Sequence, residues 1–154
     1  IANSFAVTTG SLVSNAIGAR ARNELFPICH KVLKLGYAVG IPFVVVALLC
    51  NRWIVSFYTD NELLIELAFA PFVVMLLNYT FALPGYVYLN AVGGTGKTKI
   101  TFLFQVTTTC VYLVYLYWLS FCIKASLSLY LTAEYLFVIL LALQSIIHLK
   151  SKHY

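Results

Sequence analysis

The sequence predicts an all-α membrane protein, a polytopic bundle of about five transmembrane helices. Hydrophobic residues make up 62% of the 154 residues and charged residues only 10%, whereas soluble domains hold about 45–50% and about 25%. The expected helices cover about 1–17, 28–50, 62–92, 100–122 and 133–149. At least three of these apolar stretches reach the ~20 residues that cross a bilayer core of about 30 Å.

Charge along the connecting segments supports the same fold, because basic and acidic loops alternate. The acidic loop follows the second helix and contains Asp60 and Glu62. The basic loops follow the first and third helices and, with the C-terminal tail, contain Arg20, Arg22, Lys31, Lys34, Lys97, Lys99, Lys150 and Lys152. Cytoplasmic loops carry the excess of Lys and Arg, so this alternation places the C-terminus in the cytoplasm. The lipid bilayer is the first expected partner.

Composition and charge also exclude other classes. The net charge of +5 is spread over separate segments on one predicted side, which fits topology and anionic lipid rather than nucleic acid. The four cysteines show neither a C-x-x-C pair nor a metal-ligand spacing, so we predict no metal site. Ile1 stands inside an apolar stretch with no charged segment before it. We therefore expect no signal peptide, and we expect this chain to be a fragment of a longer protein.

Small residues recur at intervals of four in the first two predicted helices. In lipid there is little hydrophobic drive between helices, and small residues supply the packing because they let two backbones approach. We therefore expect these positions to be helix contacts. They are Ala6, Gly10, Ser14 and Gly18 in the first helix and Gly36 and Gly40 in the second.

The third helix has the clearest predicted start, a capping box. Thr59 is expected to accept a hydrogen bond from the amide of Glu62, whose side chain would reach back to the amide of Thr59. A short amphipathic piece at 54–58 is expected to lie on the membrane surface before it. Pro84 and Gly85 interrupt the helix about two-thirds of the way along, and we predict that they form a hinge.

Polar side chains in the third and fourth helices are expected at membrane depth. Beside a proline break, such residues are tolerated mainly against protein or water. The sequence therefore predicts that they line a substrate cavity, with hydrogen bonding between helices alone as the alternative. The candidates are Asn78, Tyr79, Thr80, Asn90 and Gln105. Glu134, in contrast, is expected to start the last helix, where an acid complements the helix dipole.

Residues 93–98 read Gly-Gly-Thr-Gly-Lys-Thr and nearly spell the phosphate-binding loop G-x-x-x-x-G-K-[ST]. The first glycine of that loop should lie five residues before Gly96, where this chain has Ala91. The loop should also follow a strand, whereas here it joins two apolar helices. We therefore predict a tight turn between helices and no nucleotide binding.

Three short segments mark helix boundaries along the chain. Residues 18–20 (Gly-Ala-Arg) close the small-residue helix. Residues 57–60 (Phe-Tyr-Thr-Asp) precede the long helix, and residues 90–98 (Asn-Ala-Val-Gly-Gly-Thr-Gly-Lys-Thr) form a turn of the type G-x-G-x-T after it. In sequence, order and spacing these segments resemble the multidrug and toxic compound extrusion (MATE) transporters, and the resemblance covers nearly the whole chain.

The resemblance implies the C-terminal lobe, from the eighth helix to the twelfth, of a twelve-helix, two-lobe antiporter in the plasma (inner) membrane. It also implies export of amphipathic or cationic small molecules, such as drugs and toxins, in exchange for Na⁺ or H⁺. The small-molecule substrate and the N-terminal lobe of the same transporter are then further partners. No cofactor and no enzymatic chemistry are implied.

Family members hold their coupling carboxylates in the N-terminal lobe, the seventh helix or the tenth helix. The counterpart of the tenth helix is about 62–92, where Phe81 and Pro84 occupy the region that bears an acid in some members. The coupling ion is therefore expected mainly in the N-terminal half.

Two alternatives remain open at the level of sequence. A flippase for lipid-linked sugars belongs to the same superfamily, but it would be expected to line its cavity with Arg or Lys for pyrophosphate. A structural membrane subunit without a transport cycle would use the polar cluster only to pack helices. A membrane enzyme is disfavoured because the helices lack clusters of His or acidic residues at membrane depth.

Overall fold

The computed structural model describes residues 2–123 and 126–151, which are all-helical apart from short turns. The helices are α1 (Ala2–Gly18), α2 (Leu25–Leu49), α3 (Asn51–Ser56), α4 (Glu62–Gly94), α5 (Thr98–Trp118) and α6 (Leu127–Ser151). A 3₁₀ turn, Arg22–Glu24, leads into α2, and a π-helical turn, Leu119–Ile123, follows α5. Within the described residues, four helices are long and apolar enough to cross a membrane: α2, α4, α5 with part of its π turn, and α6. The predicted all-α membrane class is confirmed, but α1, the first of the five predicted transmembrane helices, has 17 residues and is not among these four.

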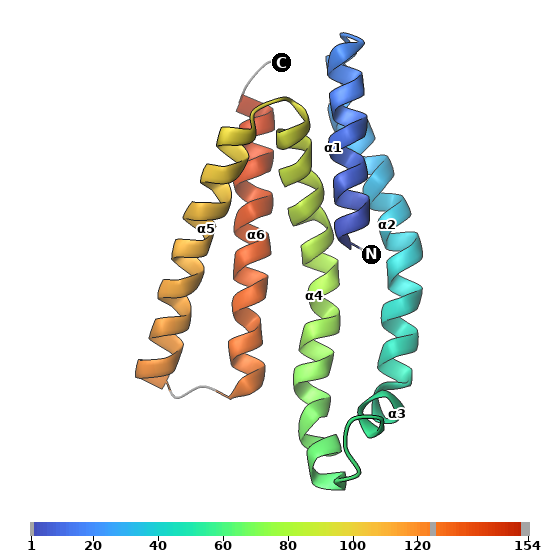
Figure 1. The fold of residues 1–154 in the computed structure, drawn as a ribbon, viewed down its shortest axis with the longest axis vertical. Coiled ribbons are helices and arrows are strands. Elements are labelled where there is room, and N and C mark those ends of the chain that lie inside the picture. Colours follow the sequence, from blue (N-terminus) through green and yellow to red (C-terminus); the bar gives the residue numbers. More distant parts are fainter. Residues whose placement is uncertain (1, 124–125, 152–154) are drawn as a thin grey trace.

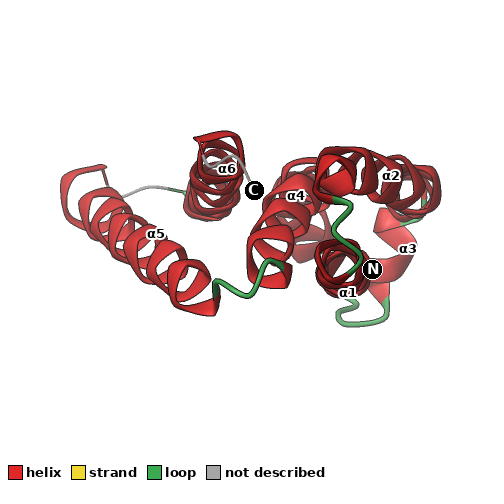
Figure 2. Ribbon diagram, turned by 90° about the horizontal axis from the view of Figure 1, so that it is seen from above, coloured by secondary structure: helices red, strands yellow, loops and turns green. Residues whose placement is uncertain are grey.

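The long helices run alternately up and down, so that the connections fall into two groups (Figure 1). The α1–α2 connection, the α4–α5 turn and the end of α6 lie at one end of the bundle, and α3 lies at the other. The charge alternation predicted this grouping. Seen from above, α4 lies between α1 and α2 on one side and α5 and α6 on the other (Figure 2). It packs against α6, α1 and α2, whereas α5 packs mainly against α6.

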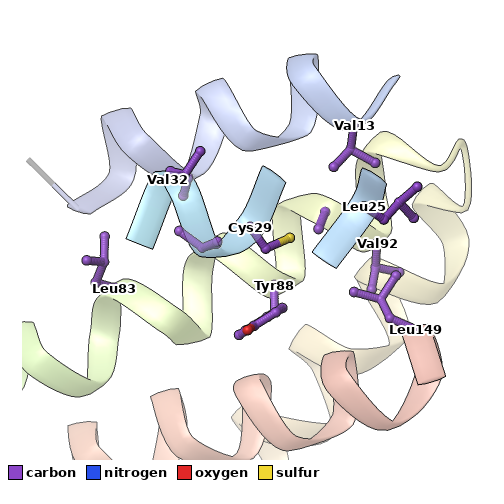
Figure 3. Packing of buried hydrophobic residues seen from close by; sticks show 11 residues of the cluster. Val13, Leu25, Cys29, Val32, Leu83, Tyr88, Val92 and Leu149 are labelled. Atoms are coloured by element: carbon purple, nitrogen blue, oxygen red, sulfur yellow. The ribbon is translucent and has the colours of Figure 1, made fainter. Parts of the chain in front are cut away.

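The main cluster of buried side chains lies where α1, α2, α4 and α6 meet (Figure 3). Other buried residues, among them Leu119 and Ala133, lie outside this cluster. Figure 3 labels eight members of this cluster: Val13, Leu25, Cys29, Val32, Leu83, Tyr88, Val92 and Leu149. All the buried residues of α4 lie between Ala82 and Val92. The first half of α4 is therefore left without buried side chains.

Close backbone approaches at glycines hold α4 to its neighbours. A Cβ atom on Gly36 would lie 2.7 Å from a methyl carbon of Leu83, and one on Gly85 would lie 2.7 Å from the carbonyl oxygen of Val138. A Cβ on Gly94 would collide with the backbone of Gly10. These contacts are the close approaches that small residues permit between membrane helices.

Only part of the small-residue stripe of α1 contacts another helix. Gly10 faces α4, with the carbonyl oxygen of Asn90 3.3 Å from where its Cβ would stand. Ser14 is exposed, and a Cβ on Gly18 would meet nothing within 4 Å. The spacing of four is close to the helical repeat but exceeds it. The stripe therefore turns gradually away from α4, and its last two members leave the interface.

The long helix begins where predicted, at Glu62, but its cap differs from the predicted one. Asn61 is the N-cap, and its Oδ1 accepts a hydrogen bond of 3.0 Å from the amide of Leu63. The Oγ1 of Thr59 accepts from the amide of Asn61 at 3.2 Å. The predicted reciprocal pair between Thr59 and Glu62 is wrong, because Asn is at least as strong a cap as Thr and stands next to the helix.

The last helix begins at Leu127, six residues before the predicted start. The predicted span of 17 residues lies at the lower limit for crossing a bilayer, and the apolar residues before it extend the helix to a comfortable length. Glu134 consequently lies seven residues inside α6 and not at its N-terminus. The basic end is as expected, with His148 and Lys150 in the last turn.

Candidate substrate-binding cavity

A cavity of about 740 Å³ lies among α1, α2, α4 and α6, beside the first half and the middle of α4. Its size falls in the range of small-molecule sites, roughly 300–1,000 Å³. Its walls are mostly apolar, with a few polar side chains. The lining residues are Ala2, Asn3, Gly40, Phe43, Val44, Ala47, Met75, Leu76, Asn78, Tyr79, Ala82, Tyr86, Leu131 and Glu134.

Asn78 offers an unused hydrogen-bond acceptor at this cavity. Its Oδ1 atom is buried and accepts no hydrogen bond from any residue that the structure describes. Leaving a buried polar group unpaired costs about 1–3 kcal/mol, and such groups call for an explanation. The amide oxygen therefore has an unmet hydrogen-bonding capacity next to the cavity.

Tyr79 borders the cavity with its ring, while its hydroxyl serves helix packing. The hydroxyl donates to the carbonyl oxygen of Gly36 at 2.7 Å, and the ring lies against Gly40. One residue further along each helix, Tyr37 donates to the carbonyl oxygen of Thr80 at 2.7 Å. These reciprocal bonds fasten α2 to α4. Because the hydroxyl of Tyr79 is already bonded to α2, its ring is the part that can contact a ligand in the cavity.

The other three predicted cavity residues lie elsewhere. Thr80 is exposed and does not line the cavity. Asn90 lies in a second, polar cleft of about 530 Å³ between α1 and the end of α4, where its amide donates to the carbonyl oxygen of Tyr86 at 2.9 Å. Gln105 is exposed on α5. The structure thus brings together two of the five predicted residues.

Comparison with known protein families agrees with this architecture. The sequence model of the MatE family matches residues 1–119. The chain belongs to the MatE family. Members of this family are membrane transporters and not enzymes. No curated protein and no solved structure matches the chain.

Sequence reasoning missed three polar residues that line the cavity of this MatE chain, Asn3, Tyr86 and Glu134. Asn3 is exposed, whereas Tyr86 and Glu134 are half-buried. The signal for Glu134 was the length of the last helix: a span that reaches about 20 residues and ends near Lys150 must begin before 133, which moves Glu134 inside it. Tyr86 carried no signal of its own among the many aromatic residues of this chain.

The predicted hinge lies inside an uninterrupted helix, since α4 continues through both of its prolines. Gly85 is buried against the backbone of Val138, so it permits a close crossing of α4 with α6. A working bend at Pro84 stays a prediction. Any test of it must keep Gly85, because a larger residue there would disturb helix packing.

The glycine-rich segment of this MatE chain forms the tight turn that the sequence predicted. α4 ends at Gly94 and α5 begins at Thr98. Gly96 has a φ angle of +85°, a conformation that glycine adopts without steric cost. The segment joins two helices, whereas a phosphate-binding loop would follow a strand.

Proposed function

We propose that this MatE chain is the C-terminal lobe of a twelve-helix secondary transporter in the plasma membrane. The transporter exports amphipathic or cationic small molecules in exchange for Na⁺ or H⁺. Two bundles rock about a central cavity and open it to each side in turn. The basic loops and the C-terminus face the cytoplasm, because Lys and Arg accumulate on that side.

The single observation that carries this proposal is the cavity beside α4. Its walls suit the apolar body of an amphipathic molecule, and the unpaired Oδ1 of Asn78 suits a hydrogen-bond donor on that molecule. The rings of Tyr79 and Tyr86 border the same space. Aromatic faces attract cations by about 0.5–2 kcal/mol, so these rings favour a cationic substrate.

The lining residues also bear on the two alternatives. No Lys or Arg is among them, so the described part of the cavity offers no counter-charge to a pyrophosphate group. A purely structural role for the polar residues would pair them with one another. Asn78 keeps its Oδ1 unpaired instead, which supports a binding role.

Substitution of Asn78 by Ala tests the proposal in the intact transporter. The variant should fold at the wild-type yield, since it removes an oxygen that makes no hydrogen bond. Efflux of a lipophilic cation that carries N–H donors, such as ethidium, should fall about tenfold, the effect expected for loss of one hydrogen bond to a charged group. Asn23→Ala, in the exposed α1–α2 connection, is the matched control and should transport normally. Equal transport by the two variants would argue against the cavity as the substrate site.

A further inference from the structure

We propose that Glu134 is a binding site for the coupling cation in this half of the transporter. The proposal rests on the antiport described above and deepens it. The resemblance to the family implied that the coupling ion binds mainly in the N-terminal half, because the long helix has no acid in the matching region. The structure shows an acid, Glu134, well inside a different helix, α6.

The position of Glu134 along α6 removes it from the membrane surface. Seven residues separate it from the first residue of the helix, about 10 Å along the helix axis at 1.5 Å per residue. Its side chain is half-buried and lines the cavity beside Leu131 of the preceding turn. The other acids in the described residues differ, because Glu24, Asp60, Glu62 and Glu66 are all exposed and lie outside this cavity.

Among the described residues that line the cavity beside Glu134, none is Lys, Arg or His. The titratable groups around Glu134 are tyrosines: Tyr79 and Tyr86 of α4 at the cavity wall, and Tyr112 of α5, which lies near the Glu134 carboxylate. The segments of α1 and α2 that line the cavity contribute no titratable side chain.

An ionisable residue at membrane depth is costly, and such residues mark ion pathways or pair with another charge. Since no basic side chain among the described residues lines the cavity, a mobile cation is the counter-charge that the cavity can bring to this carboxylate. A proton or Na⁺ supplies one, since each binds to a carboxylate oxygen.

Reconstituted transporter separates cation coupling from substrate binding. Two activities are measured with tetraphenylphosphonium: transport driven by an imposed ion gradient, and exchange of labelled for unlabelled substrate without a gradient. A pH gradient and a Na⁺ gradient are applied in separate arms, so that wild-type protein identifies the cation. If wild-type protein shows neither activity, the proposed function fails and the inference about Glu134 falls with it.

Glu134→Gln keeps the shape of the side chain and removes its charge. We expect gradient-driven transport to fall tenfold or more, about the effect of losing one partner of a buried charge interaction. Substrate exchange needs no coupling cation and should fall less than gradient-driven transport, although Glu134 also borders the substrate cavity. Glu66→Gln, an exposed acid near the start of α4, is the matched control and should leave both activities intact.

The remaining outcomes also decide the matter. Gradient-driven transport by Glu134→Gln at the wild-type rate overturns the proposal. Equal loss of both activities overturns it as well, because Glu134 would then serve substrate binding or folding. Glu134→Asp covers the case in which the glutamine variant folds poorly. It keeps a carboxylate and should retain coupling with a changed dependence on the driving cation, and loss of that coupling in folded protein would contradict the assignment.

Discussion

The two halves of α4 differ in what surrounds them, although both are apolar. Residues 82–94 contain all the buried side chains of the helix and the glycine contacts with α1 and α6. Residues 62–81 contain none of those buried side chains and border the cavity through Met75, Leu76, Asn78 and Tyr79. Each half also has one asparagine. The amide of Asn90 donates to a backbone carbonyl, whereas the Oδ1 of Asn78 has no partner.

This difference teaches that side-chain size, more than hydropathy, decides which part of a membrane helix is packed. The second half is rich in small residues, among them Ala82, Gly85, Ala91 and Gly94. Lipid is as apolar as a leucine side chain, so large apolar residues gain little from leaving it, and small ones allow backbones to approach. One helix can therefore pack the bundle at one end and border an open cavity at the other.

The largest expected effect is on the packed half. Gly85→Ala places a methyl group 2.7 Å from the carbonyl oxygen of Val138. The helices must separate, which should lower the free energy of unfolding by about 1–3 kcal/mol. Thermal unfolding in detergent measures this change. Gly18→Ala is the matched control, since Gly18 has open space around it, and it should not be destabilised. Equal stability of the two variants would show that the close contact at Gly85 does not stabilise the packed half of α4.

The two asparagines should show opposite effects when each is replaced by Ala. Asn90→Ala loses a hydrogen bond and should lose about 1 kcal/mol of stability, with transport retained. Asn78→Ala loses no hydrogen bond and should keep its stability, but transport should fall. Melting temperature and efflux are measured on the same preparations. A fall in transport for Asn90→Ala alone would move the substrate site to the second cleft.

A smaller effect is expected at the boundary between the halves, at Pro84. Pro84→Ala restores a backbone donor and leaves Gly85 and its contact with Val138 in place. If the proline permits α4 to bend during transport, turnover should fall by about threefold, as for other residues that act through motion. Substrate binding should persist. Turnover at the wild-type rate would show that the proline is only a packing detail.

The smallest effect is expected at the end of the packed half. Lys97→Ala in the glycine-rich turn should leave transport within about twofold of wild type, because the turn joins two helices and we predict that it binds no nucleotide. ATP binding is measured in parallel by equilibrium dialysis. Binding that this substitution abolishes would restore the phosphate-loop interpretation.

Most of the fold was predictable because the bilayer fixes helix length and loop charge. Apolar stretches and alternating charge predicted the helices and the grouping of their connections. The spacing of small residues predicted that Gly36 and Gly40 lie at helix contacts. The side chain of Leu83 lies against Gly36, and the ring of Tyr79 lies against Gly40. The cap at Asn61 was missed because Thr59, Asn61 and Glu62 each offer plausible capping chemistry within four residues.

The cavity was only partly predictable, because the position of a polar residue along a helix does not show whether its side chain faces the cavity. Asn78, Tyr79 and Thr80 are consecutive, so about 100° of rotation separates each from the next. Asn78 and Tyr79 border the cavity and Thr80 does not. Glu134 was missed for a different reason. Its proposed role depends on how far Glu134 lies from the N-terminal end of α6. That distance depends on where α6 starts, and the sequence marks this start only weakly.

The central claim is that the cavity beside the first half of α4 receives the substrate. Single cysteines at positions 75 and 90, in an otherwise cysteine-free transporter, test it directly, since Met75 borders the cavity and is exposed. The rate of maleimide labelling is measured at each position with and without tetraphenylphosphonium. We predict that the cation slows labelling at position 75 severalfold, as expected when a ligand buries most of its surface in a pocket, and leaves position 90 unchanged. Protection at position 90 alone, or at neither position, would contradict the claim.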